Sequence, residues 1–382
     1  MSTMLSPPRP TAPGGVQPLG FVPALDGVRA LAVLIVVAYH GDWFRIQGGF
    51  IGVDVFFVLS GFLITRLLVD EHARFGEISL RSFYLRRALR LFPALAGLVA
   101  GVALAAALLD APALEDNLTA RSLWAISYVT NWHDVVTHTH GGPFSHTWSL
   151  SVEEQFYIVW PVVVIALLRH RGVAAVRAFA GMGYVVTAGM TALRFWNGAN
   201  GFDLYFATHS HGLVLLLAGS CLGATPRLLE LASQPMGRRL LAVGTAGVAL
   251  LALLPDRFGP VHAGAGYLPV TVCSLALVSG ATIARNTSLL TWGPLRRIGA
   301  SSYGIDLWHL PMFTLAPIVA PAADPKLRII IGTAIATVLS HVLIERPAMR
   351  FKHRWTRTEQ RTPTEDAEPL RTAAVPAHQP EG

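Results

Sequence analysis

Long apolar runs separated by short polar segments dominate the chain. A helix that spans a bilayer needs about 20 mostly apolar residues, and ten runs approach this length. They cover residues 25–44, 49–69, 92–110, 148–168, 173–193, 208–224, 240–255, 267–284, 300–320 and 329–345. The runs are unbroken rather than alternating, which favours helices over a membrane β-barrel. The pattern predicts an all-α, polytopic bundle of about ten transmembrane helices, with a shorter interfacial or re-entrant piece at residues 123–132.

The basic residues assign an orientation to this bundle. If the N-terminus is cytoplasmic, the inner segments hold 23 of the 30 Lys and Arg residues and the outer segments hold six, while Arg29 lies inside the first helix. Cytoplasmic loops of membrane proteins are enriched in Lys and Arg. The sequence therefore predicts that both termini are cytoplasmic, in a multi-pass protein of the inner (plasma) membrane.

Composition agrees with a membrane protein. Hydrophobic residues make up 52% of the chain and charged residues only 14%, against about 25% charged in an ordinary soluble domain. The net charge of +7 does not indicate a nucleic-acid partner, because the basic residues are spaced between apolar runs rather than clustered on one face. We expect disordered cytoplasmic tails at residues 1–20 and 351–382, the second one basic, around a membrane domain at residues 21–350.

Ionisable residues inside the predicted spans are costly and mark candidate chemistry. The first span carries Arg29 and His40, which lie roughly on one helix face and about 16 Å apart along the axis. Asp54 is buried near the outer end of the second span, and the short linker would allow it to meet His40. The alternative is structural: Arg29 snorkels to the inner headgroups, His40 caps the outer end, and Asp54 makes a structural hydrogen bond.

Two further charged pairs lie at opposite ends of the bundle. Arg87 and Arg90 share a helix face on the cytoplasmic side, and paired guanidinium groups suit phosphate oxygens. Positive-inside anchoring is the alternative for this pair. Glu153 and Glu154 open the fourth span at the outer level of His40, where a carboxylate can orient a histidine and stabilise its protonated form.

The last two spans complete the set. Asp306 and His309 share a face at mid-depth of the ninth span, and Glu345 ends the tenth at the inner face. Together these residues predict an arginine-rich inner mouth and a histidine-carboxylate outer mouth. An outer loop also holds three histidines, namely His138, His140 and His146. We interpret these as solvated and predict no metal site, because no second ligand pair accompanies them.

In matching order, these motifs resemble the acyltransferase-3 family of membrane-bound bacterial O-acyltransferases. The resemblance covers about residues 25–347. It is carried by Arg29 with ten residues to His40, Gly52-Val53-Asp54 with Ser60-Gly61, Arg87-Ala88-Leu89-Arg90, Trp148 through Tyr157, Ser302-Tyr303 through His309, and Glu345-Arg346-Pro347.

The resemblance implies an acyl-CoA co-substrate, typically acetyl-CoA, that enters from the cytoplasm, and no tightly bound cofactor. It implies a hydroxyl-bearing acceptor, either a cell-envelope carbohydrate or a secondary metabolite such as a macrolide polyketide. Relatives often have an acid and an arginine where this chain has residues 208–212, so the identity of the acceptor is harder to infer from the family. They also often have an aromatic residue at the position of Asp306. The chain ends soon after Pro347, so we expect it to act without the periplasmic hydrolase-like domain of some relatives, alone or with a separate partner.

The resulting hypothesis is O-acyl transfer by an acyltransferase that moves groups other than amino-acyl groups. His40 is the general base, and Glu153 orients it, with Asp54 as the alternative partner. Binding of the phosphates or the pantetheine arm of the donor is assigned to Arg29, Arg87 and Arg90. Supporting roles are assigned to Asp26, Asp54, Ser151, Tyr157, His309 and Glu345.

A polytopic transporter or flippase is the rival interpretation. Asp and His residues at mid-membrane depth also suit proton relays. Transporter folds often contain internal repeats, and the sequence shows none. This favours the enzyme, for which the sequence predicts the lipid bilayer, the acyl donor and the acceptor as partners and leaves the oligomeric state open.

Overall fold

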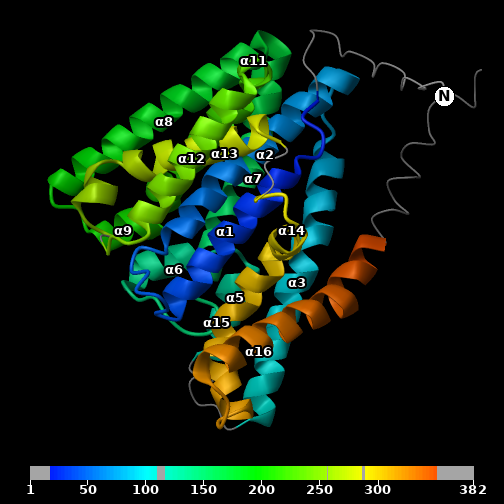
Figure 1. The fold of residues 1–382 in the computed structure, drawn as a ribbon, viewed down its shortest axis with the longest axis vertical. Coiled ribbons are helices and arrows are strands. Elements are labelled where there is room, and N and C mark those ends of the chain that lie inside the picture. Colours follow the sequence, from blue (N-terminus) through cyan, green and yellow to red (C-terminus); the bar gives the residue numbers. More distant parts are fainter. Residues whose placement is uncertain (1–17, 110–116, 256, 286–288, 351–382) are drawn as a thin grey trace, which may run out of the picture.

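The computed structural model describes residues 18–109, 117–255, 257–285 and 289–350, and every regular element within these ranges is helical (Figure 1). In chain order the elements are α1 (Pro23–His40), α2 (Ile51–Phe75), α3 (Leu80–Leu108), α5 (Leu118–Ile126), α6 (Thr130–Thr137), α7 (Thr147–Arg171), α8 (Val173–Trp196), α9 (Gly201–Phe206), η1 (Thr208–Gly212), α10 (Leu213–Gly223), α11 (Pro226–Leu231), α12 (Gln234–Leu251), η2 (Pro260–Gly264), α13 (Leu268–Ile283), α14 (Gly293–Ala300), α15 (Ser302–Val319), α16 (Pro325–Ser340) and η3 (His341–Glu345). The predicted tails at residues 1–20 and 351–382 lie almost wholly outside the described residues.

Each of the ten predicted apolar runs forms a helix, and the all-α class is confirmed for the described residues. Six helices there are long and apolar enough to cross a membrane: α1, α2, α3, α7, α8 and the helix over Pro325–Arg350. The number of ten membrane spans and the orientation of the bundle stay predictions. The predicted piece at 123–132 is divided between two short helices, α5 and α6.

One helix is much longer than the apolar run predicted for it, and it includes the turn on which Arg87 and Arg90 are predicted to share a face. The third helix begins at Leu80 rather than at residue 92, because Ser79 caps it by accepting a hydrogen bond from the Ser82 backbone N–H at 3.3 Å. The basic residues Arg87 and Arg90 therefore lie well inside a continuous helix. The hydropathy of the sequence does not show where this helix begins, because the charges of Arg87 and Arg90 interrupt the apolar run.

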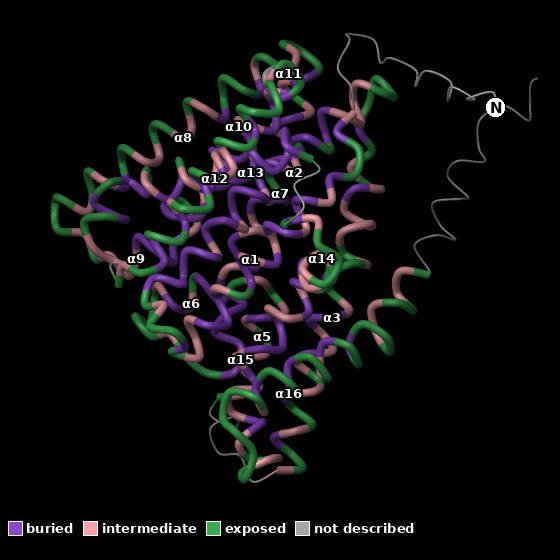
Figure 2. The backbone as a smooth tube through the Cα atoms, in the orientation of Figure 1, coloured by how far each residue is buried: buried purple, intermediate pink, exposed green. Residues whose placement is uncertain are grey.

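Burial divides the bundle into a centre and a lipid-facing shell. Figure 2 shows the buried backbone concentrated in α1, α2 and α7, and the exposed backbone on α8 and α16. The exposed positions of α8 include Phe179, Met182, Val185 and Leu193. Large apolar side chains on an outer face, around a helix bundle with charges inside, are the arrangement expected in lipid.

Close packing of α2 against α10, and a π-helical turn just before α10, position the side chains inside the bundle. Gly61 on α2 lies against the Leu216 carbonyl, and Gly219 on α10 lies against the Val58 carbonyl. Small residues allow such close backbone approach between membrane helices. Immediately before α10, η1 is a buried π-helical turn, a local widening that is frequent at functional sites.

Candidate active site

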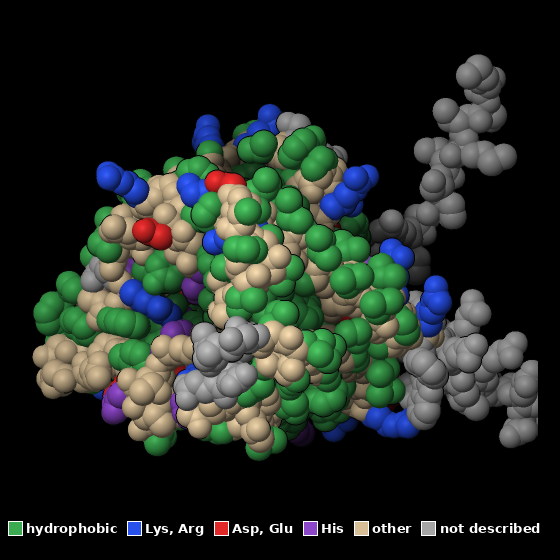
Figure 3. Space-filling model, turned by 90° about the horizontal axis from the view of Figure 1, so that it is seen from below, with side chains coloured by type: hydrophobic (Ala, Val, Ile, Leu, Met, Phe, Trp, Pro, Cys, Tyr) green, Lys and Arg blue, Asp and Glu red, His purple; other side chains and the backbone are tan. Residues whose placement is uncertain are grey.

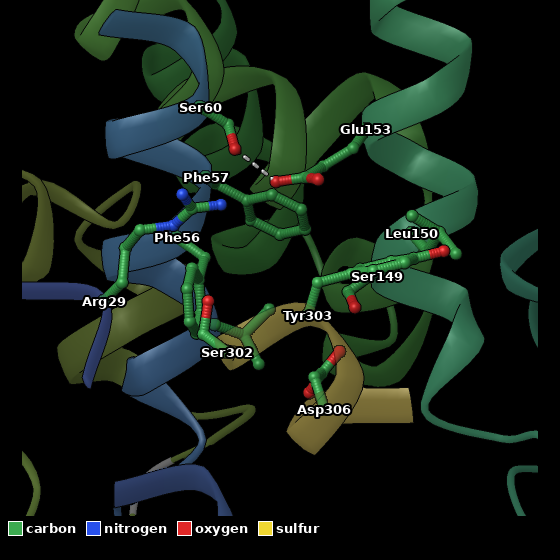
Figure 4. A pocket seen from close by; sticks show the side chains of 11 residues that line it. Arg29, Phe56, Phe57, Ser60, Ser149, Leu150, Glu153, Ser302, Tyr303 and Asp306 are labelled. Carbon is green, nitrogen blue, oxygen red and sulfur yellow. Dashed lines mark hydrogen bonds between the residues drawn. The ribbon is translucent and has the colours of Figure 1, made fainter. Parts of the chain in front are cut away.

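A pocket lies between α1, α2, α7 and α15 (Figure 4). It is lined by Arg29, Val53, Phe56, Phe57, Ser60, Ser149, Leu150, Glu153, Ser302, Tyr303 and Asp306. Figure 4 shows the Arg29 guanidinium and the Glu153 carboxylate entering it from α1 and α7. The Ser60 hydroxyl donates a hydrogen bond of 2.6 Å to Glu153 Oε1, so α2 fixes the position of this carboxylate.

The arginines predicted to hold the donor differ in their surroundings. Arg87 is engaged: its Nε and Nη2 lie 2.8 and 2.7 Å from Glu154 Oε1, and its guanidinium stacks 3.3 Å from the centroid of the Tyr157 ring. Among the described residues, neither Arg29 nor Arg90 has a hydrogen-bond or ion-pair partner, and their charges repel each other. Two adjacent cations that form no direct ion pair make a place where a further anion would be stabilised.

Asp26 and Arg296 belong to the same electrostatic cluster. Asp26 interacts with three guanidinium groups, those of Arg29, Arg90 and Arg296. Arg296 lies on α14, the short helix that packs against α1. Sequence reasoning did not single out Arg296, because the positive-inside rule alone explains a basic residue between spans.

A second, smaller pocket contains His40 in its wall. It is lined by Val36, Tyr39, His40, Phe50, Val53, His140, His146, Trp148, Ser149, Tyr205, Arg257 and Asp306. Val53, Ser149 and Asp306 line both pockets. The two pockets therefore adjoin, so that Arg29 lies on one side of these shared residues and His40 on the other.

The hydrogen bonds of two histidines determine where their protons lie. His309 Nδ1 contacts the Asp306 carbonyl at 2.5 Å, and His40 Nδ1 contacts the Val36 carbonyl at 3.1 Å. A carbonyl only accepts, so both Nδ1 atoms carry hydrogen in these contacts. His309 Nε2 lies 3.1 Å from His40 Nδ1, so the single Nδ1 hydrogen of His40 is shared between the Val36 carbonyl and His309 Nε2. This arrangement leaves His40 Nε2 as a proton acceptor.

The carboxylates that the sequence assigned to His40 have other partners. Glu153 is bound by Ser60, and Asp54 Oδ1 lies 2.7 Å from Nε2 of His211, with both side chains fully buried. In the part of the chain that the structure describes, His40 instead contacts His309. The expectation that Glu153 or Asp54 orients His40 is corrected accordingly: the rotation of α2 directs Asp54 toward η1 and away from α1.

The remaining supporting residues lie around these pockets. Ser151 is buried and donates to the Thr147 carbonyl at 2.9 Å, so its hydroxyl is used within its own helix. Tyr157 is buried beneath Arg87. Glu345 accepts hydrogen bonds from Ser340 at 3.4 Å and His341 at 3.2 Å within the last turns, and it lines neither pocket.

The outer-loop histidines are more ordered than predicted. His140 Nδ1 lies 2.7 Å from buried Asp134, and His138 lies 3.1 Å from Asp203. His146 is buried and, like His140, lines the His40 pocket. In the described part of the chain, no three His, Cys, Asp or Glu side chains converge as metal ligands would.

Apolar helices surround the two adjoining pockets, one lined by Arg29, Glu153 and Asp306 and the other by three histidines. This arrangement defines a polytopic membrane protein with ionisable groups in its interior. Residues 22–345 match the family model described as an acyltransferase domain. The chain therefore belongs to the acyltransferase-3 family, as its motifs predicted.

Curated relatives support this assignment. The chain is 32% identical over 349 residues to the peptidoglycan O-acetyltransferase OatA of Listeria monocytogenes, covering 87% of this chain and 55% of that protein. It is 31% identical over 351 residues to the putative peptidoglycan O-acetyltransferase YrhL of Bacillus subtilis, covering 86% and 55%. For the O-acetyltransferase OatA of Staphylococcus aureus the values are 33% over 307 residues, 76% and 50%. The chain thus spans about half the length of these relatives. No solved structure matches it.

Proposed function

We propose that the chain transfers an acyl group, in the simplest case acetyl, from acyl-CoA to a hydroxyl of a cell-envelope carbohydrate, in the inner (plasma) membrane. The observation that carries this proposal is the pair of adjoining pockets, one lined by Arg29 and the other by a histidine with a free acceptor nitrogen. Family membership supplies the reaction class. Relatives named for peptidoglycan favour a carbohydrate acceptor over a macrolide.

The donor would bind at the arginine side. Arg29 and Arg90 form no direct ion pair among the described residues, although the Asp26 carboxylate interacts with both, so their guanidinium donors are available to the phosphates of CoA. Arg87 is held by Glu154 and Tyr157 and contributes its positive charge from a fixed position. The thioester would then extend past Ser149 and Asp306 toward His40.

The transfer itself needs one base. His40 Nε2 removes the proton of the acceptor hydroxyl while the oxygen attacks the thioester carbonyl carbon. The C–O bond of the ester forms, the C–S bond breaks, and the proton passes from His40 to the departing CoA thiolate. The contact with His309 holds the His40 ring in the tautomer that this step requires.

The test is acceptor-dependent release of CoA thiol by the purified protein in lipid nanodiscs, with acetyl-CoA and a peptidoglycan-derived glycan. We expect a mass gain of one acetyl group on the glycan. General-base catalysis contributes about 10²–10⁴ in rate, so His40→Ala should lose at least about 100-fold. His138→Ala, which removes an exposed histidine from the outer loop, is the matched control.

Two results would contradict the proposal. Near wild-type acetyl transfer by His40→Ala would remove His40 as the base. Uptake of the glycan into vesicles without consumption of acetyl-CoA would favour the transporter interpretation instead.

A further inference from the structure

We propose that Arg257 gives the His40 pocket selectivity for a carbohydrate that carries an anionic oxygen group, a carboxylate or a phosphate, beside its acceptor hydroxyl. The inference rests on the proposed function and specifies its acceptor. Arg257 lies in the segment between α12 and η2, which is far in sequence from every motif that identifies the family.

The guanidinium of Arg257 is enclosed by aromatic rings. Its central carbon lies 4.4 Å from the ring centroid of Tyr205, 5.2 Å from that of Phe258, 5.3 Å from that of Phe206 and 5.9 Å from that of Phe50. Ring faces stabilise a cation, and the Tyr205 side chain also interacts with this guanidinium through its hydroxyl group. Nε is buried and has no hydrogen-bond partner.

No protein carboxylate neutralises this cation among the described residues. The nearby acids are committed elsewhere: Asp54 to His211, and Asp134 to His140 and His133. Asp306 lines the same pocket but forms no ion pair with Arg257. A partly desolvated guanidinium whose Nε has no hydrogen-bond partner is well suited to a contact with a carboxylate or phosphate.

The position of Arg257 links this contact to the reaction. Arg257 and His40 line one pocket and interact electrostatically. The other walls are largely aromatic, with Tyr39, Phe50 and Trp148, and ring surfaces with a few placed polar groups are typical of ligand sites. On the end of the molecule drawn in Figure 3, histidine and Lys/Arg side chains reach the surface close together on the left of the view. An anionic sugar held by Arg257 would present a neighbouring hydroxyl to His40.

The alternative role for Arg257 is structural, as a brace for the four rings around it. The two roles predict different kinetics. A brace affects every acceptor equally, whereas an anion-binding residue affects only acceptors that carry the anion.

The experiment uses matched acceptors. One is a glycan strand containing N-acetylmuramic acid with free lactyl carboxylates, and the second is the same strand with those carboxylates amidated. A third, a phosphorylated glycan, distinguishes phosphate from carboxylate recognition. Binding of each to the wild-type protein is measured without acetyl-CoA, and kcat/KM is then measured with it.

We expect the wild-type protein to prefer an anionic strand to the amidated one by about tenfold or more, the effect of one hydrogen-bonded charge contact. Arg257→Gln should remove this preference, measured as the ratio of kcat/KM for the anionic strand to that for the amidated strand, while Arg257→Lys should retain part of it. Arg194→Gln is the matched control, because Arg194 contacts His209 outside both pockets.

Three outcomes would overturn the inference: equal binding of charged and amidated strands, no binding of any strand, or an equal loss on all acceptors in Arg257→Gln. Failure of the proposed function looks different. In that case the anionic strand binds through Arg257, but no acceptor-dependent CoA release follows.

Discussion

The contact between His40 and His309 requires a hydrogen-bond acceptor at position 309. Its Nδ1 donates to the Asp306 carbonyl and its Nε2 accepts from His40. His309→Ala removes the acceptor that helps to hold the His40 tautomer, and we expect kcat to fall about 10- to 100-fold, a part of the contribution of a general base. His309→Gln can place an amide oxygen near the former Nε2 and should recover part of the rate.

The measurement is kcat for acceptor-dependent CoA release, with KM for acetyl-CoA determined in parallel. A positioning role predicts a change in kcat with little change in this KM. Equal rates for the His309→Ala and His309→Gln proteins would exclude the hydrogen bond to His40 as the relevant feature.

The unpaired arginines lead to a second prediction about individual residues. Because Arg29 and Arg90 form no direct hydrogen bond or ion pair among the described residues, Arg29→Gln and Arg90→Gln should each raise KM for acetyl-CoA about tenfold, through loss of a charge contact with a phosphate. S-acetyl-N-acetylcysteamine is the matched donor, since it carries the thioester without phosphates. The same variants should use this short donor at the wild-type rate; an equal defect with both donors would contradict phosphate binding.

Sequence reasoning located these residues along their helices but not their partners. Arg29 and His40 were predictable because charges inside apolar runs are rare. The contact between His40 and His309 joins positions 269 residues apart, and it depends on how α1 and α15 are rotated toward each other. The partners of Asp54 and Glu153 were missed for the same reason.

At the scale of helices, the glycines between α2 and α10 give a prediction about stability. A side chain at Gly61 would fall on the Leu216 carbonyl, so Gly61→Val should force α2 and α10 apart at a cost of about 1–3 kcal/mol. We expect a lower midpoint of thermal unfolding, measured by the loss of monodisperse protein after heating in detergent. Gly189→Val is the control, because nothing lies within 4 Å of a side chain there. Equal midpoints for the two variants would show that the contact is not a tight one.

Helix ends were less predictable than helix positions. The apolar period identified all ten runs, but α3 begins at its Ser79 cap, upstream of the charged turns. The π-helical turn at η1 also had no hydropathy signal, although it places His211 against Asp54. Local hydrogen bonding determines both features, and it leaves average hydropathy unchanged.

The whole molecule has two ends, and the proposed reaction requires that they face different compartments. The adjoining pockets connect Arg29 near one end of α1 with His40 at the other. Acyl-CoA is cytoplasmic and an envelope glycan is not, so the arginine end must be the inner end. The excess of basic residues in the inner segments predicts the same orientation.

Cysteine labelling across α8 tests this orientation. In a background with Cys221→Ala and Cys273→Ala, single cysteines replace His170 before α8 and Asn197 after it, both exposed positions. A membrane-impermeant maleimide added to intact cells should label the Asn197→Cys protein but not the His170→Cys protein, and inside-out vesicles should give the reverse. Labelling of both from one side would show that α8 does not cross the membrane. The opposite pattern would place the Arg29 end outside, away from cytoplasmic acyl-CoA, and the proposed donor would then be excluded.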